Sequence, residues 1–114
     1  MTRLLLRMNP VVITPGISFA SMDDATSDYL GDCLNELYEG SDGLIDDEEH
    51  EANEADLARG CGKVVAKYPA HGHLLENFYI VAYFDEAAIR DENHNYTLIM
   101  YVSEYDNELI HVDR

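Results

Sequence analysis

The chain has 114 residues, 46% of them hydrophobic, and its 23 acidic and seven basic residues give a net charge of −16. This length suits one domain, and the hydrophobic content excludes a chain that is disordered throughout. The charge argues against direct contact with nucleic acid or anionic lipid, and no apolar run is long enough to span a membrane. Because the N-terminal segment lacks the apolar core of an export signal, we expect a cytoplasmic protein.

In chain order, the first predicted element is an edge strand. Residues 3–14, "RLLLRMNPVVIT", contain two short apolar runs separated by Asn9-Pro10. Proline cannot donate a hydrogen bond to a central ladder, so we expect one edge strand at 11–14. The Pro15-Gly16 pair then predicts a turn.

The clearest pattern in the chain predicts an amphipathic helix over residues 22–39. Ser21 is the expected N-cap, and Gly40 is expected as the residue just past the C-cap. Cys33 falls on the apolar stripe and is expected in the core, since two cysteines do not make a disulfide framework. The stripe consists of Met22, Ala25, Tyr29, Leu30, Cys33, Leu34, Leu37 and Tyr38, and the outer face of Asp24, Asp28, Asp32, Asn35, Glu36 and Glu39.

The acidic residues are concentrated in the first half of the chain. Residues 8–58 hold fourteen acids and no Lys or Arg, whereas the other 63 residues hold nine acids and seven bases. Within this region, residues 46–59 predict a second helix that ends at Gly60, with Leu57 as its only large apolar residue. A helix with so little to bury gains little from packing, so we expect either a lightly docked helix or a partly ordered loop.

The second half of the chain predicts strands at 63–67, 78–84 and 96–103, with a candidate final strand at 109–112. The segment 78–84, "FYIVAYF", is apolar throughout, as expected of a central strand covered on both faces, and 85–95 is a polar connection with room for one helical turn. We therefore predict a single α+β domain over 1–114, with an antiparallel sheet of three to five strands packed against the 22–39 helix. The expected core is Tyr29, Leu30, Leu34, Leu37, Phe78, Ile80, Ala82, Leu98, Met100 and Val102.

Alternation along 96–103 assigns its two faces. Tyr96, Leu98, Met100 and Val102 share the face expected to lie in the core. The other face carries Thr97, Ile99, Tyr101 and Ser103, and we expect it to be available as a homodimer interface.

The sequence gives little support to enzyme chemistry. It has no nucleophile elbow, no glycine-rich phosphate loop and no zinc or calcium motif, so we expect no enzyme, no catalytic residue, no metal and no cofactor. His71 and His73 stand two residues apart. The alternative from another functional class is a small metal-binding module or metal-dependent enzyme built on these two histidines and nearby acids.

The acidic residues themselves predict a binding surface. Asp24, Asp28, Asp32 and Glu36 follow one another at intervals of four, a spacing at which like charges destabilise a helix. A face that served only solubility, which is the simplest alternative, would include lysines. The predicted partner-binding residues are Asp24, Asp28, Asp32, Glu36, Glu39, Asp46, Asp47, Glu48, Glu49, Glu51, Glu54 and Asp56.

The two acidic segments are expected to form one surface that imitates the phosphates of DNA. The partner would be a basic nucleic-acid-binding protein, and the chain would act as its inhibitor. An immunity protein that neutralises a nuclease toxin would use the same physics and is the nearest alternative.

Three segments, "VVITPGI", "NFYIVAYFD" and "YTLIMYVSEYD", resemble parts of a family of short proteins carried on proteobacterial plasmids and other mobile elements. The resemblance covers about 27 residues, mostly predicted strands, and the 46–56 segment has no counterpart in it. That family has no assigned activity. The resemblance implies a mobile-element setting, in which small acidic proteins act as anti-CRISPR or anti-restriction factors.

Overall fold

A computed structural model describes residues 2–106 of the chain. Ten elements follow one another: η1 (Arg3–Met8), β1 (Val11–Ile13), α1 (Pro15–Ala20), α2 (Asp24–Tyr38), α3 (Asp47–Arg59), β2 (Cys61–Tyr68), β3 (Phe78–Asp85), η2 (Glu86–Ala88), β4 (Tyr96–Tyr101) and α4 (Val102–Asp106). The predicted strand at 109–112 lies outside the described residues. None of the described helices is long and apolar enough to cross a membrane.

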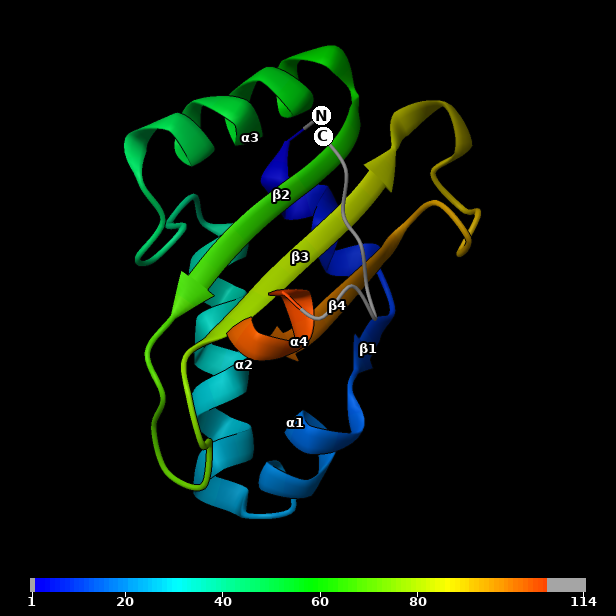
Figure 1. The fold of residues 1–114 in the computed structure, drawn as a ribbon. Coiled ribbons are helices and arrows are strands. Elements are labelled where there is room, and N and C mark those ends of the chain that lie inside the picture. The colour runs from blue at the N-terminus through cyan, green and yellow to red at the C-terminus, as the bar shows by residue number, and fades with distance from the viewer. Residues whose placement is uncertain (1, 107–114) are drawn as a thin grey trace.

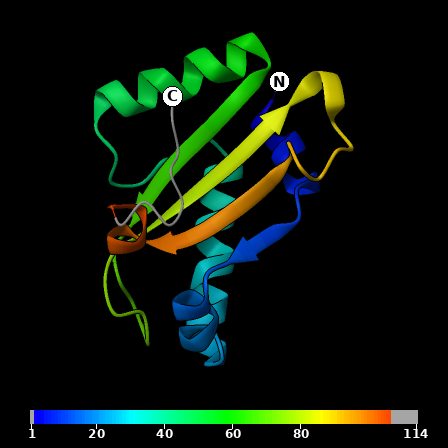
Figure 2. The same ribbon diagram turned by 45° about the vertical axis from the view of Figure 1, so that its right-hand side comes forward.

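The four strands form one mixed sheet in the order β1-β4-β3-β2 (Figures 1 and 2). β2, β3 and β4 are antiparallel to one another, while β1 pairs with β4 in parallel, from Val11 opposite Thr97 to Ile13 opposite Ile99. The predicted α+β domain is therefore confirmed, and β1 is the edge strand expected from the position of Pro10. The parallel pairing of β1 differs from the purely antiparallel sheet that the sequence predicts.

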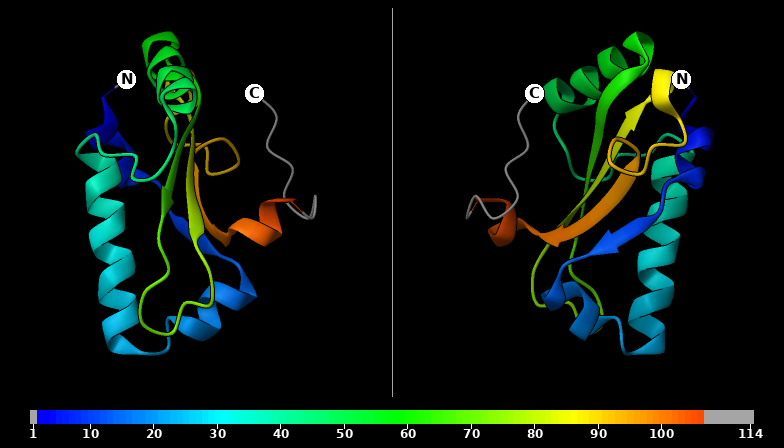
Figure 3. Two further views of the ribbon diagram at one scale, coloured as in Figure 1. Left: turned by 60° about the vertical axis from the view of Figure 1, so that its left-hand side comes forward. Right: turned by 90° about the vertical axis from the view of Figure 1, so that its right-hand side faces the viewer.

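One face of the sheet packs against α2, as Figure 3 shows from the side. Leu30, Cys33 and Leu37 of α2 meet Ile80 and Ile99 of the sheet in the larger of two buried clusters. Cys33 is buried as expected, and its burial raises the pKa of its thiol to about 11. The amphipathic pattern of 22–39 thus places the helix correctly against the sheet.

The opposite face of the sheet has its own smaller apolar cluster. Val65, Val81, Leu98 and Met100 are buried there beneath partly buried tyrosines. Because β3 and β4 are apolar on both faces, each contributes alternate residues to each cluster. The prediction that Thr97, Ile99 and Tyr101 form an exposed dimer face is wrong, since all three are buried on the side of α2.

Local differences at the helix ends follow from capping chemistry. The N-cap of α2 is Asp23, whose carboxylate accepts a hydrogen bond from the Thr26 backbone N–H at 3.0 Å, and not Ser21. Ser21 instead ends α1, which starts at Pro15 where a turn was expected, because proline suits the first position of a helix. Strand β4 ends at Tyr101, so Val102 lies in α4 and is only half-buried.

Candidate interaction surface

The outer face of α2 carries an uninterrupted row of carboxylates. The apolar stripe of the helix turns Leu30 and Leu37 toward the sheet, and this leaves the positions at intervals of four pointing away from it. Among the described residues no ion pair involves any member of the row, and all four are exposed. We call Asp24, Asp28, Asp32 and Glu36 the α2 acidic row.

The acids of α3 and its N-terminal loop are used in several ways. Asp46 is the N-cap and accepts a hydrogen bond from the Glu49 backbone N–H at 2.8 Å, while Glu54 pairs with Arg3 at 2.9 Å. Glu49 is half-buried. The remaining acids of this helix that are exposed are Asp47, Glu48 and Glu51.

Asp56 is buried, and the prediction that it contributes to an exposed binding surface is wrong. Its carboxylate accepts a hydrogen bond from the backbone N–H of Lys63 in β2 at 3.1 Å and from Arg59 at 2.5 Å. The sequence of 46–59 could not predict the burial of Asp56, because the side of α3 that faces the sheet is mostly polar and has no apolar pattern.

Two arginines of η1 separate the α2 acidic row from α3. Arg3 donates to the Leu37 carbonyl at the end of α2, to Asp42 in the following loop and to Glu54 in α3. Arg7 donates to Asn35 at 3.1 Å and lies 3.9 Å from the Glu39 carboxylate. These two cations interrupt the acidic surface, so α2 and α3 present two acidic areas with a basic junction and not the single surface expected from the sequence.

The two histidines considered as metal ligands lie in the loop between β2 and β3. The His71 ring packs against Tyr29 with their centroids 4.8 Å apart, and His73 Nε2 lies 3.8 Å from an Asp23 carboxylate oxygen. Nowhere in residues 2–106 do three or more His, Cys, Asp or Glu side chains come together in a group that could hold a metal ion.

A second feature lies at the end of the molecule opposite η1, and the sequence did not lead us to predict it. Phe19, Met22 and Leu75 are 80, 81 and 86% exposed, and we call these three residues the apolar end. Figure 3 shows that α1, the start of α2 and the β2–β3 loop meet at this end. The three residues lie around one pocket of about 420 Å³, which is lined by Gly16, Phe19, Ala20, Met22, Asp23, His73, Leu75 and Tyr101.

The apolar end could be found only in part from sequence. Met22 fits the apolar stripe of the 22–39 pattern, but the helix begins after it, and so its side chain projects into solvent. Leu74 and Leu75 stand together in a polar loop, and only Leu74 is buried. A pair of leucines in such a loop indicates that one of them faces outward, but it does not indicate which.

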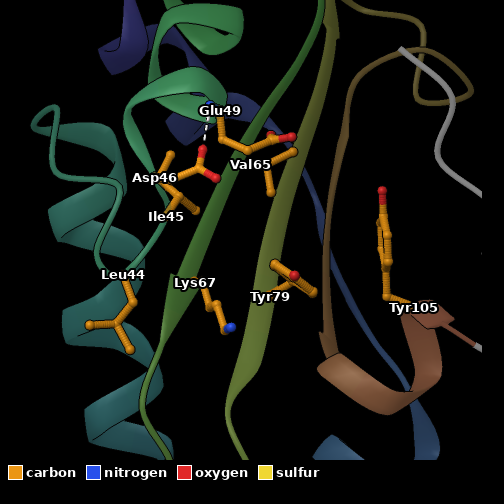
Figure 4. Close-up of a pocket in the computed structure, with 8 residues that line it drawn as sticks. All are labelled: Leu44, Ile45, Asp46, Glu49, Val65, Lys67, Tyr79 and Tyr105. Carbon is orange, nitrogen blue, oxygen red and sulfur yellow. Dashed lines mark hydrogen bonds between the residues drawn. The ribbon is translucent and has the colours of Figure 1, made fainter.

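A smaller pocket of about 270 Å³ lies on the face of the sheet opposite α2 (Figure 4). Among the described residues that line it, Lys67 is the only basic one, and its ammonium lies 5.9 Å from the ring centroid of Tyr79. Asp46 and Glu49 also line this pocket, so its charges are mixed. The remaining lining residues are Leu44, Ile45, Val65 and Tyr105.

Comparison with protein-family models, with curated proteins and with solved structures found no match to this chain.

Proposed function

We propose that the protein is an acidic inhibitor that occupies the basic nucleic-acid-binding surface of another protein in place of the nucleic acid. The observation that carries this proposal is the α2 acidic row, whose four exposed carboxylates have no ion-pair partner among the described residues. Three successive like-charge pairs on one helix face each cost a few tenths of a kcal/mol. A partner that brings positive charge to this row removes that repulsion.

The spacing of the row supports imitation of a phosphate backbone. Carboxylates four residues apart on a helix are separated by a rise of about 6 Å, and the whole row extends over about 18 Å. DNA carries one phosphate per ~3.4 Å of axis on each strand, so the row presents a line of negative charge at about half the density of a single DNA strand. The net charge of −16 adds fast, steered association with a basic partner.

The proposed surface is narrower than the twelve residues expected from sequence. Asp56 is buried and Glu54 is paired with Arg3, so α3 contributes chiefly Asp47, Glu48 and Glu51. The arginines of η1 stand between these residues and α2. We therefore assign the main contact to the α2 acidic row and a secondary contact to α3.

A charge-reversal series tests the proposal. The first variant carries Asp28→Lys, Asp32→Lys and Glu36→Lys, and the second carries Glu48→Lys, Glu51→Lys and Glu92→Lys. All six residues are exposed, and both variants undergo the same change of net charge. Wild type and variants are used as bait in lysate of the native host at ~50 and ~200 mM salt, where electrostatic binding weakens steeply. The captured proteins are then purified and their DNA binding is measured with and without the bait.

The proposal requires that wild type captures a basic nucleic-acid-binding protein at low salt and blocks its DNA binding at stoichiometric amounts. The α2 variant should do neither, while the second variant should retain most of both activities. Equal loss in the two variants would mean that net charge alone matters. Retention by the α2 variant would refute the proposed surface. The captured partner also decides between an anti-defence factor and an immunity protein, since the first binds a host-defence protein and the second a nuclease toxin.

A further inference from the structure

We infer that the apolar end is a docking site for a basic protein segment that carries one large apolar side chain. This inference rests on the proposed function and adds the chemistry of the partner to it. Three large apolar side chains that are at least four-fifths exposed and border one pocket make a concentrated patch. Such patches on soluble proteins mark interaction sites, where a few buried apolar anchors supply much of the affinity.

The pocket at the apolar end is held in place by hydrogen bonds and packing. The buried Thr26 hydroxyl accepts a hydrogen bond from the His73 backbone N–H at 3.0 Å and donates to Asp23 at 2.9 Å. The Leu75 backbone N–H donates to the Tyr101 hydroxyl at 3.4 Å, which ties the loop to the sheet.

The helix α1 packs closely on the same Tyr101. A Cβ on Gly16 would come within 2.9 Å of the Tyr101 ring. The backbone of both walls is thus held around one buried tyrosine, so binding need not order that backbone.

The charges around the pocket determine the occupant. No Lys or Arg occurs in residues 14–28 and 69–77, which meet at this end, or in 101–105, whose Tyr101 lines the pocket. The acids of these three segments are Asp23, Asp24, Asp28, Glu76 and Glu104. A second copy of the chain would bring the same acids against each other, and like-charge juxtaposition opposes that contact. A basic segment with one large apolar side chain matches both the apolar pocket and the acidic residues around it.

The position of the apolar end fits a single continuous contact with the proposed partner. Met22 and Asp23 directly precede α2, and Asp24 is both the first residue of that helix and the first member of the α2 acidic row. A basic protein laid along the row therefore reaches the pocket within one helical turn. The row would supply charge attraction and the apolar end a hydrophobic anchor.

Two synthetic peptides serve as defined probes. Both have twelve residues and the same Lys and Arg content; one has a central Trp and the other a central Ser. Affinity is measured by fluorescence anisotropy at ~50 mM salt, where charge contacts are strong. The proteins compared are wild type, Met22→Ser/Leu75→Ser, the α2 charge-reversal variant, and Leu4→Ser/Met8→Ser. The last is the matched control, because Leu4 and Met8 are exposed apolar residues on η1.

Wild type should bind the Trp peptide about tenfold tighter than the Ser peptide, as burial of one apolar side chain implies. The Met22→Ser/Leu75→Ser variant should lose this preference and bind the Ser peptide as wild type does, while the η1 control keeps the preference. A preference that is absent in wild type, or that survives in Met22→Ser/Leu75→Ser, overturns the inference. Failure of the proposed function looks different: the α2 variant would then bind both peptides as tightly as wild type.

Folding of each variant is checked by circular dichroism and thermal unfolding. The side chains of Met22 and Leu75 project into solvent, so their replacement removes no core contact. As a second readout, methyl resonances of Met22 and Leu75 should shift on addition of the Trp peptide while that of Met8 does not. Shifts confined to other residues count against the assigned site.

Discussion

Asp42 is a buried acid whose carboxylate is hydrogen-bonded within the fold. Its side chain is 3% exposed, and it accepts hydrogen bonds from both terminal nitrogens of Arg3, from His50 at 2.8 Å and from Asn53 at 3.0 Å. Burial by itself would raise the pKa of Asp42, but these hydrogen bonds and the charge of Arg3 outweigh burial and hold the pKa below its usual value. One of the 23 acids in the chain therefore stabilises the junction of η1, α2 and α3.

Asp42→Asn should destabilise the protein by about 2–3 kcal/mol at pH 7, because the Arg3 side chain, which is 9% exposed, loses its buried counter-charge and keeps only the exposed Glu54. Urea unfolding followed by circular dichroism measures the change. Asp47→Asn removes the same charge from an exposed position in the first turn of α3 and should change the free energy of unfolding by no more than about 0.5 kcal/mol. Equal effects of the two substitutions would contradict the role given to Asp42.

The same carboxylate predicts a pH dependence. Since the pKa of Asp42 is lower in the folded chain than in the unfolded chain, its contribution to stability is complete above the ordinary Asp pKa of about 3.9. The contribution is lost as the pH falls below that value and through the lowered pKa. The difference in unfolding free energy between wild type and Asp42→Asn should therefore be largest near neutral pH and shrink below about pH 4.

At the scale of elements, α3 closes an edge of the sheet that would otherwise be open. Asn53 is fully buried, and its side-chain amide accepts from the Val65 N–H at 2.9 Å and donates to the Val65 carbonyl at 2.8 Å. Asp56 accepts from the N–H of Lys63, and the loop before α3 exchanges backbone hydrogen bonds with Lys67. The outward N–H groups of Lys63, Val65 and Lys67 and the carbonyls of Val65 and Lys67 thus find partners in side chains and a loop, which protects the strand from pairing with other chains.

Asn53→Ala should cost about 2–4 kcal/mol, because both backbone groups of Val65 lose their partner in a buried place. Asn53→Asp should also destabilise, since a carboxylate cannot donate to the Val65 carbonyl and would lie against Asp42. Glu51→Ala, an exposed change on the same helix, is the control and should have little effect. Hydrogen exchange provides a local readout: the Val65 amide should exchange faster in Asn53→Ala and unchanged in Glu51→Ala.

The polar docking of α3 against this edge explains why the sequence predicted some elements well and others poorly. The 22–39 helix and the 78–84 strand bury apolar residues at regular spacing, so their type and place follow from the pattern. The helix α3 docks mainly through Asn53 and Asp56, with Leu57 as its buried apolar contact, and hydrophobic spacing does not detect polar docking. For the same reason, the exposure of the α2 acids could be predicted and the burial of Asp56 could not.

At the scale of the whole molecule, the concentration of acidic residues favours binding to a basic partner but lowers the stability of the free protein. The α2 acidic row repels itself, and the surplus of acids over the whole chain adds to this repulsion. Added salt screens both interactions. We therefore expect salt to stabilise the free protein and, over the same range, to weaken its binding to a basic partner. A solubility surface would show only the first of these two effects.

Alternating the signs along the row tests this opposition directly. In Asp28→Lys/Glu36→Lys, the three repulsive pairs between Asp24 and position 36 become attractive, which should raise the free energy of unfolding by about 1–2 kcal/mol at low salt. Thermal unfolding at ~20 mM and ~500 mM salt measures the gain, which should shrink as screening increases. Because lysine has a higher helix propensity than aspartate, part of the gain would come from propensity and not from charge. Asp28→Gln/Glu36→Gln is the control, since it removes the repulsion without adding attraction. It should give about half the gain. The same alternating variant should bind the basic probe peptides more weakly than wild type. If the alternating variant is no more stable than wild type, the row is not under electrostatic strain, and relief of that strain by a basic partner loses its support.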